Sequence, residues 1–189
     1  MGAILDIIGS LAVRGVILTL IISLIITLRD AQYERTSVAT TGQNLSVAAR
    51  VMEKDLKYAG YNADSTIVNV FLAADSQHVK VLGDLDDNYV PATGAGMDTI
   101  DYQIWADPSG EVDSKVIARK INSQPPWYIA KGPVSMKIMY YDSLGAPTST
   151  LANILSISVL LSMKNHYPID DTLYATIHRE ILVFPSNLQ

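Results

Sequence analysis

The sequence predicts an α+β fold in which a long N-terminal α-helix packs on an antiparallel β-sheet domain. Residues 1–28 are almost continuously apolar, and residues 29–59 carry one apolar stripe at helical spacing. The rest of the chain alternates short apolar runs with turn sequences, which is typical of strands. We therefore expect a helix over 1–60, with its apolar segment at 1–28, and a globular sheet domain over 61–189.

The apolar segment contains only two charged residues, Asp6 and Arg14. As a helix, Ile4 to Leu28 would extend about 37 Å, which exceeds the roughly 30 Å thickness of a bilayer core. No basic residue precedes this segment and no small-x-small cleavage site follows it. A cleaved secretory signal is therefore disfavoured, and we interpret the helix as a working part of the protein.

From Arg29 onward the pattern is that of a helix with one buried face. The residues expected to pack this face on the sheet are Leu45, Ala49, Met52 and Leu56. Lys54 and Lys57 suit the negative end of the helix dipole, and Gly60 is a natural left-handed stop. The two patterns together predict one helix from about residue 2 to about residue 59.

The remaining chain has the pattern of strands joined by turns. The runs expected to form strands are 66–74, 78–83, 99–106, 115–121, 134–142, 153–164 and 172–184. Asp107-Pro-Ser-Gly110 has the composition of a turn, so 99–106 and 115–121 should form a hairpin. No repeat or low-complexity linker divides this part, so we expect one antiparallel sheet on the amphipathic half of the helix.

Composition excludes several classes of function. The formal net charge is −5 and cysteine is absent, so a nucleic-acid partner, disulfides and thiolate chemistry are not expected. No G-x-S-x-G, phosphate-binding loop or H-E-x-x-H motif occurs. The sequence therefore predicts a protein that is not an enzyme and carries no cofactor.

The acidic loop of residues 84–88 supplies oxygen atoms of the kind that hard cations prefer. It lacks the glycine and terminal glutamate of an EF-hand loop, so a solvated turn without metal is the favoured interpretation. Asp84, Asp86 and Asp87 are the candidate ligands if a metal binds. His78, His166 and His178 are too scattered to indicate a metal site.

Two aromatic segments, Pro125-Pro-Trp-Tyr128 and Tyr140-Tyr141, admit two interpretations. Their side chains are either part of the core or a contact patch for another subunit or a ligand. Since most such residues pack inside, the core is the favoured interpretation.

The run Arg50-Val-Met-Glu-Lys-Asp-Leu-Lys-Tyr-Ala-Gly-Tyr61, preceded by Gln43-Asn44, resembles the end of the long helix in minor type IV pilins of the PilW and PulJ kind. There an amphipathic helix closes on a D-[LI]-[RK]-x-A-G-Y signature. Segments 101–104, 117–120, 134–145 and 177–183 are similar to the same group.

The resemblance implies a structural subunit of an extracellular, type IV pilus-like filament on the cell surface. Residues 1–28 would lie in the inner membrane before assembly and in the filament core afterwards, with the sheet domain outside. The implied partners are further copies in a helical homo-oligomer, together with other pilins. The alternatives are a membrane-anchored exported binding module, or a pseudopilin of a secretion system that does not form long filaments.

Counting back from Tyr61 by the length of the family's helix places the mature N-terminus at Gly2 and the family's buried glutamate at Asp6. The leader peptide and its processing signature G-F-T-L-x-E are missing from the sequence, with Met1 where the leader would end. A second register, with Arg14-Gly15 as the processing site, leaves no carboxylate at the right distance.

Asp6 and Arg14 would need partners in a filament core, because a buried carboxylate stays ionised only when it is paired. They lie about 12 Å apart along one helix and cannot meet within one subunit. We hypothesise that Asp6 pairs with Arg14 or with the Met1 amine of a neighbouring subunit. The alternative is that both charges lie at the membrane interface of a simple anchor.

Gly9 and Gly15 bracket the same region, and each costs about 1 kcal/mol relative to alanine inside a helix. One expectation is that the helix unwinds between them, as a stretch of the buried helix does in filaments of the resembling family. The other is that small residues only permit close helix packing at a subunit interface.

Overall fold

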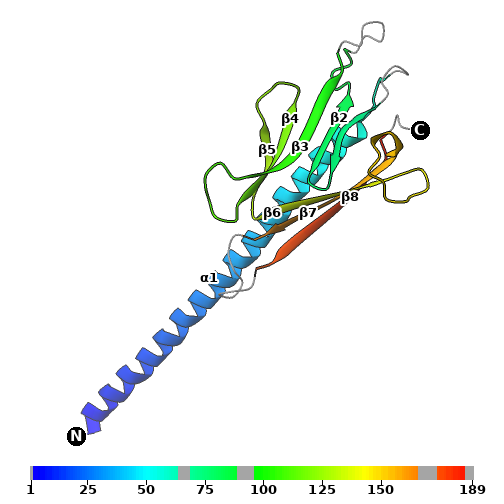
Figure 1. Ribbon diagram of the computed structural model, residues 1–189. Helices are drawn as coiled ribbons and strands as arrows, with labels where there is room; N and C mark the ends of the chain where they lie inside the picture. Colours follow the sequence, from blue (N-terminus) through cyan, green and yellow to red (C-terminus); the bar gives the residue numbers. More distant parts are fainter. Residues whose placement is uncertain (1, 64–68, 89–95, 166–173, 186–189) are drawn as a thin grey trace.

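The computed structural model describes residues 2–63, 69–88, 96–165 and 174–185, with only the backbone of residues 3–8. One helix, α1 (Gly2–Lys57), runs through the whole molecule. Its N-terminal half projects alone, and its C-terminal half carries a β-rich head (Figure 1). The predicted α+β class, a long helix packed on antiparallel sheet, is confirmed.

The head contains two antiparallel sheets. The first has the strand order β1 (Phe71–Asp75), β2 (His78–Gly83), β3 (Asp98–Ala106), β4 (Lys115–Ile121) and β5 (Trp127–Gly132). The second has the order β6 (Val134–Tyr141), β7 (Ser156–Lys164) and β8 (Thr176–Val183), with a short 3-10 helix, η1 (Leu151–Asn153), before β7. The predicted hairpin of 99–106 and 115–121 is confirmed as β3 and β4.

The expectation of one sheet is wrong, because the chain leaves the first sheet directly after β5. Gly132 has a φ of 127°, which few other residues adopt, and Pro133 has no N–H to continue a ladder. The following strand β6 pairs with β7 instead. A backbone hydrogen bond from the Ile138 amide to the Ser76 carbonyl, 2.8 Å long, joins the second sheet to the β1–β2 turn.

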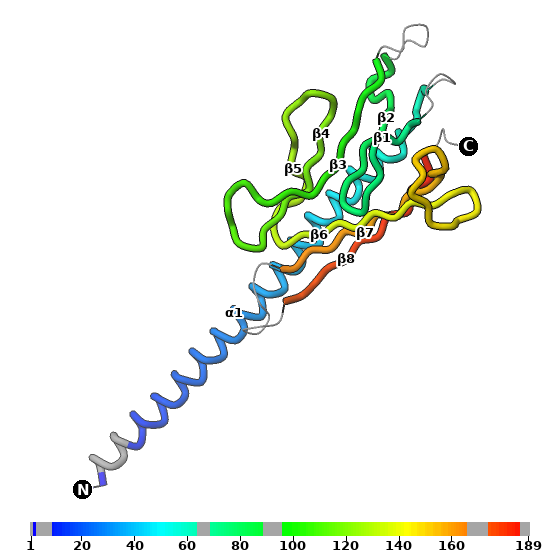
Figure 2. Tube along the Cα trace, in the orientation of Figure 1, coloured from blue at the N-terminus to red at the C-terminus, as the bar shows by residue number. Residues whose placement is uncertain are grey.

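Both sheets pack on the same half of the helix. The predicted packing residues Leu45, Ala49, Met52 and Leu56 are buried in one core cluster with side chains from both sheets. The trace in Figure 2 shows the second sheet crossing the helix nearest to the point where the helix enters the head. There the Ile177 side chain of β8 lies 3.6 Å from the position that a Cβ on Gly42 would take.

The end of the helix is joined directly to the first sheet. Gly60 has a φ of 76°, so the predicted left-handed stop is confirmed, and its amide donates to the Leu82 carbonyl at 2.8 Å. A Cβ on Gly83 would collide with the Tyr58 carbonyl oxygen. Two glycines therefore let the last turn of the helix lie against the end of β2.

A buried polar network fixes the helix to the middle of the first sheet. Asp55 is 4 % exposed, and its Oδ2 accepts hydrogen bonds from the Tyr102 hydroxyl and the Arg119 Nε, both 2.6 Å long. Burial, followed by the negative charge of Asp55, raises the pKa of Tyr102 well above its usual range. The three side chains come from α1, β3 and β4, so the network sets the position of the helix along the sheet.

A second carboxylate closes the β3–β4 hairpin. Asp107 accepts a hydrogen bond from the Ser109 amide at 2.9 Å and one from the Ser114 hydroxyl at 2.7 Å. The Lys131 ammonium of β5 lies 3.3 Å from the same carboxylate. These donors, the Ser109 amide foremost, hold the pKa of Asp107 well below its usual range.

We expect Asp55→Ala to lower the free energy of unfolding by about 3 kcal/mol, because it leaves Arg119 without its buried counter-charge. Urea unfolding of the full chain in detergent micelles measures this change. Glu53→Ala is the matched control, since Glu53 pairs with Lys57 on the exposed side of the same helix at 2.7 Å. That control should change stability by less than about 0.5 kcal/mol; equal losses in the two variants would contradict the assignment.

We expect Asp107 to make the stability of the head acid-sensitive. Its pKa is lower in the folded than in the unfolded state, so its contribution is present above about pH 4 and is lost as the pH falls below that value. Asp107→Asn should therefore flatten the fall in unfolding free energy on acidification. Denaturation at a series of pH values tests this, with the exposed Asp113→Asn of the same hairpin as control. An unchanged pH profile for Asp107→Asn contradicts the prediction.

Candidate assembly helix and outer face of the head

Residues 9–28 of α1, here called the apolar arm, expose their side chains on every side. The large apolar residues of the arm, each between 48 % and 64 % exposed, are Leu11, Val13, Val16, Ile17, Leu18, Leu20, Ile21, Ile22, Leu24, Ile25, Ile26 and Leu28. By length and composition the arm can cross a membrane, and none of it is buried in the single chain. A contiguous apolar surface of this size marks a site that another molecule or a membrane covers.

The arm's threonines are suited to an apolar environment because their hydroxyls bond within the helix. The Thr19 hydroxyl donates to the Gly15 carbonyl at 2.9 Å, and the Thr27 hydroxyl donates to the Ser23 carbonyl at 3.0 Å. Such back-bonding satisfies polar groups that would otherwise be costly away from water. Arg14, which is exposed, remains the charged residue of the arm.

The predicted assembly residues lie on this arm and just before it. The Asp6 side chain and the whole of Met1 fall outside the described residues. The hypothesis that Asp6 pairs with a cation of a neighbouring subunit therefore stays a prediction. Gly9 and Gly15 have open space where a Cβ would be. Small residues with open surroundings on an apolar helix leave room for another helix to approach closely.

The predicted unwinding between Gly9 and Gly15 is wrong for this chain. The α-helix continues without a break from Gly2 to Lys57. The reason is energetic, because two glycines cost only about 2 kcal/mol together and an unwound turn loses several backbone hydrogen bonds. In an apolar environment nothing in the single chain would replace those bonds.

A basic and an aromatic side chain follow the arm directly. Arg29 donates a hydrogen bond to the Tyr33 hydroxyl at 3.1 Å, and its Cζ lies 5.3 Å from the centre of the Tyr33 ring. Such Arg and Tyr side chains are typical of the boundary between a bilayer and water. The pair therefore separates the apolar arm from the part of the helix that enters the head.

The acidic loop differs from its sequence-based description. Among the described residues, Asp84, Asp86 and Asp98 have carboxylate oxygens that all lie within 4.8 Å of one another. These three could hold a hard cation. Asp84 is buried and accepts hydrogen bonds from the Asn62 side chain and the Asn88 amide, so the loop is not a wholly solvated turn.

Two residues of this loop region differ from the prediction. Asp98 joins the cluster, which the sequence did not indicate, because the register of β2 and β3 pairs Gly83 with Asp98. Asp87 does not join it. Instead, the negative charge of Asp87 and its hydrogen bond with Tyr61 raise the pKa of the Tyr61 hydroxyl.

The face of the first sheet that points away from α1, here called the outer face, is half polar and half aromatic. Across β2, β3 and β4 the register places Lys80 opposite Asp101 and Asp101 opposite Lys120. A polar groove of about 310 Å³ lies there, lined by Lys80, Thr99, Asp101, Lys120, Asn122 and Ser123. Side chains alternate along a strand, so Trp105 lies on the same face as Asp101.

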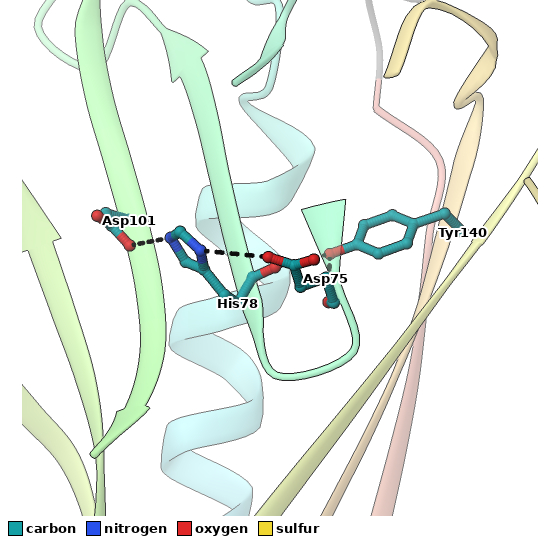
Figure 3. A network of polar contacts seen from close by, with 4 residues as sticks. All are labelled: Asp75, His78, Asp101 and Tyr140. Carbon is teal, nitrogen blue, oxygen red and sulfur yellow. Dashed lines mark hydrogen bonds and ion pairs between the residues drawn. The ribbon is translucent and has the colours of Figure 1, made fainter. Parts of the chain in front are cut away.

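His78 orients the carboxylate at the centre of this groove. Its Nε2 lies 3.0 Å from Asp101 Oδ1, and its Nδ1 lies 3.8 Å from a carboxylate oxygen of Asp75 (Figure 3). Figure 3 also shows Tyr140 of β6, whose hydroxyl contacts the Asp75 carbonyl at 3.0 Å and the His78 carbonyl at 3.1 Å. Both ring nitrogens of His78 thus face carboxylates; His178 is exposed, and His166 lies outside the described residues.

The favoured interpretation of the aromatic segments as core is wrong for one of the two. Tyr140 is buried in the core, as expected. Trp127 is 58 % exposed and Tyr128 is 40 % exposed, because β5 is an edge strand of the first sheet. Trp105 on β3 forms an edge-to-face pair with Tyr128, with ring centres 6.5 Å apart.

Comparison with known proteins identifies the fold. No family model matches the chain, and no curated protein matches its sequence. The structure is similar to that of a type IV-like pilin from Thermus thermophilus, with a TM-score of 0.50 and 12 % sequence identity. The similarity covers 78 % of this chain and 97 % of that one. A long helix with an apolar arm and a β-head, together with this similarity, shows that the protein has a type IV pilin-like fold.

Proposed function

We propose that this protein is a structural subunit of a type IV pilus-like extracellular filament, and that its apolar arm bundles with the arms of other copies. The observation that carries the proposal is the complete exposure of the arm on a pilin-like fold. Covering its apolar side chains contributes about 1.5–3 kcal/mol for each one, so the arm as a whole drives association strongly.

Either lipid or sister helices can cover the arm, and its charges favour sister helices as the final environment. A cation such as Arg14 costs about 2.5–3.5 kcal/mol near the centre of a bilayer. A neighbouring helix displaced by about 12 Å would place its Arg14 beside Asp6, and this pairing would offset part of the cost of both charges. The arm therefore lies in the inner membrane before assembly and in the filament core afterwards.

The head serves as the outer coat in this arrangement. Its core is closed without the arm, and its helix ends beside the first sheet, so each copy adds one folded head to the filament surface. Identical subunits joined by a contact that does not close on itself form a helical filament. The proposed role is structural and not catalytic, with further copies and other pilins as partners.

The alternative is a membrane-anchored exported module, or a pseudopilin that forms no long filaments. In that case Arg14 would lie at the membrane interface and the arm would remain in lipid. Electron microscopy and sedimentation after detergent removal distinguish the two functions. Long particles are expected for a filament subunit, and detergent-extractable monomers that never elongate would contradict the proposal.

We expect Asp6→Ala to reduce filament yield at least tenfold, since its loss leaves a cation unpaired in the apolar core. Arg14→Ala should do the same if Arg14 is the partner, whereas normal yield for Arg14→Ala together with loss for Asp6→Ala would identify the Met1 amine. Ser10→Ala, between the two charges, is the matched control and should assemble normally. Normal filaments from both charge variants would end the pairing hypothesis.

We expect a cysteine pair to report the stagger directly, because the chain has no other cysteine. Chains carrying Val13→Cys mixed with chains carrying Ile21→Cys should cross-link in filaments, since these positions lie seven residues, or about two turns, beyond Asp6 and Arg14 on the same side of the helix. Chains carrying Val13→Cys mixed with chains carrying Leu28→Cys should not, because Leu28 lies about 10 Å further along that side than Ile21. Cross-linking is measured on denaturing gels, and equal yields from both mixtures would contradict the stagger.

A further inference from the structure

We infer that the outer face of the first sheet binds an acidic oligosaccharide, with its negative group between Lys80 and Lys120 and a neighbouring sugar ring on Trp105 and Tyr128. This face lies on the side of the sheet away from α1, and its residues take no part in the packing of the helix. The inference does not depend on how the apolar arm assembles.

The aromatic half of the outer face consists of two rings that lie over strand β4. Trp105 comes from β3 and Tyr128 from β5, and β4 lies between these strands. The rings reach each other, so they meet above β4, where Val116 and Ala118 pair with them in register. Val116 is 0 % exposed and Ala118 is 2 % exposed, whereas the rings remain 36 % and 40 % exposed. An apolar aromatic surface thus remains open to solvent.

The polar half adjoins this surface. Lys120 and Ala118 are two residues apart on one face of β4, a distance of about 7 Å. The groove of about 310 Å³ around Lys120 is large enough for one sugar ring. A chain of two or three linked sugars would therefore extend from the groove onto Trp105 and Tyr128.

The charges in the groove select a negative ligand. Within the described residues, neither Lys80 nor Lys120 has an ion-pair partner within 4.0 Å, although both flank Asp101 in register. Asp101 is held by His78 through Oδ1 and is also one of the residues that line the groove. Two ammonium groups against one carboxylate make the groove positive on a chain whose net charge is −5.

The mixture of donors and acceptors selects a hydroxylated ligand. The lysines and the hydroxyls of Thr99 and Ser123 donate hydrogen bonds, and Asp101 accepts them from sugar hydroxyls. A nucleic acid fits less well, since the acidic chain offers no basic stripe along which a phosphate backbone could lie. A carboxylated sugar next to a stacked ring satisfies both halves of the face.

The test uses the full chain in detergent micelles and trigalacturonic acid as the probe, with binding measured by calorimetry. We expect saturable binding that weakens about tenfold or more when Lys80→Ala and Lys120→Ala are combined. The fully methyl-esterified trimer, which has the same rings without charge, should bind at least about tenfold more weakly. Trp105→Leu and Tyr128→Leu, which keep Val116 and Ala118 covered, should each weaken binding several-fold.

The matched control combines Lys137→Ala and Lys164→Ala, two exposed lysines on the second sheet, and should leave binding unchanged. Thermal unfolding of each variant shows that the head remains folded. The inference is overturned if the trimer gives no saturable binding, or if the control weakens binding as much as the Lys80 and Lys120 variant does. Tighter binding of a single-stranded oligonucleotide than of the trimer would overturn it as well.

Discussion

The structure depends on one continuous helix that must satisfy two different environments. A helix of 56 residues is about 84 Å long, and before Thr41 none of its residues whose side chains the structure describes is buried. From Thr41 onward the same helix supplies one wall of the core. The head contacts only the C-terminal half of the helix. The contacts there must therefore hold the helix in place although its N-terminal half is unsupported. The buried stripe of the helix provides the apolar contact area. The Asp55 network fixes the position of the helix along the sheet.

The two sheets contact different parts of the helix. The second sheet packs where the helix enters the head, through β7 and β8. The first sheet receives the end of the helix through Gly60 and Gly83. In the middle of that sheet, Arg119 and Tyr102 bind Asp55 of the helix. Because the helix occupies the inner face of the first sheet, the outer face is left free. Its charged and aromatic side chains are therefore not required for the fold.

Features that depend on local periodicity were predictable from the sequence, whereas features that depend on contacts between residues far apart in the sequence were not. The helix, its packing stripe and the β3–β4 hairpin follow from spacings within short windows. Strand β5 was missed because it is an edge strand whose exposed aromatic residues follow two prolines and do not alternate. The Asp55–Arg119 bond joins residues 64 positions apart, and Asp98 meets Asp84 only through strand pairing. No sequence pattern indicates such contacts before the topology is known.

The separation between arm and head also determines how the helix can move between environments. The buried residues of the helix begin at Thr41, well beyond the end of the arm at Leu28, so the proposed transfer of the arm from lipid to a protein bundle would leave the core of the head intact. The Thr19 and Thr27 hydroxyls bond within the helix and need no partner in either environment. In the proposed assembly, Asp6 just before the arm and Arg14 within it are the residues whose free energy would differ most between lipid and a bundle of sister helices. The apolar side chains make the arm insoluble in water, and in the proposed function the charges decide which of the two apolar environments it occupies.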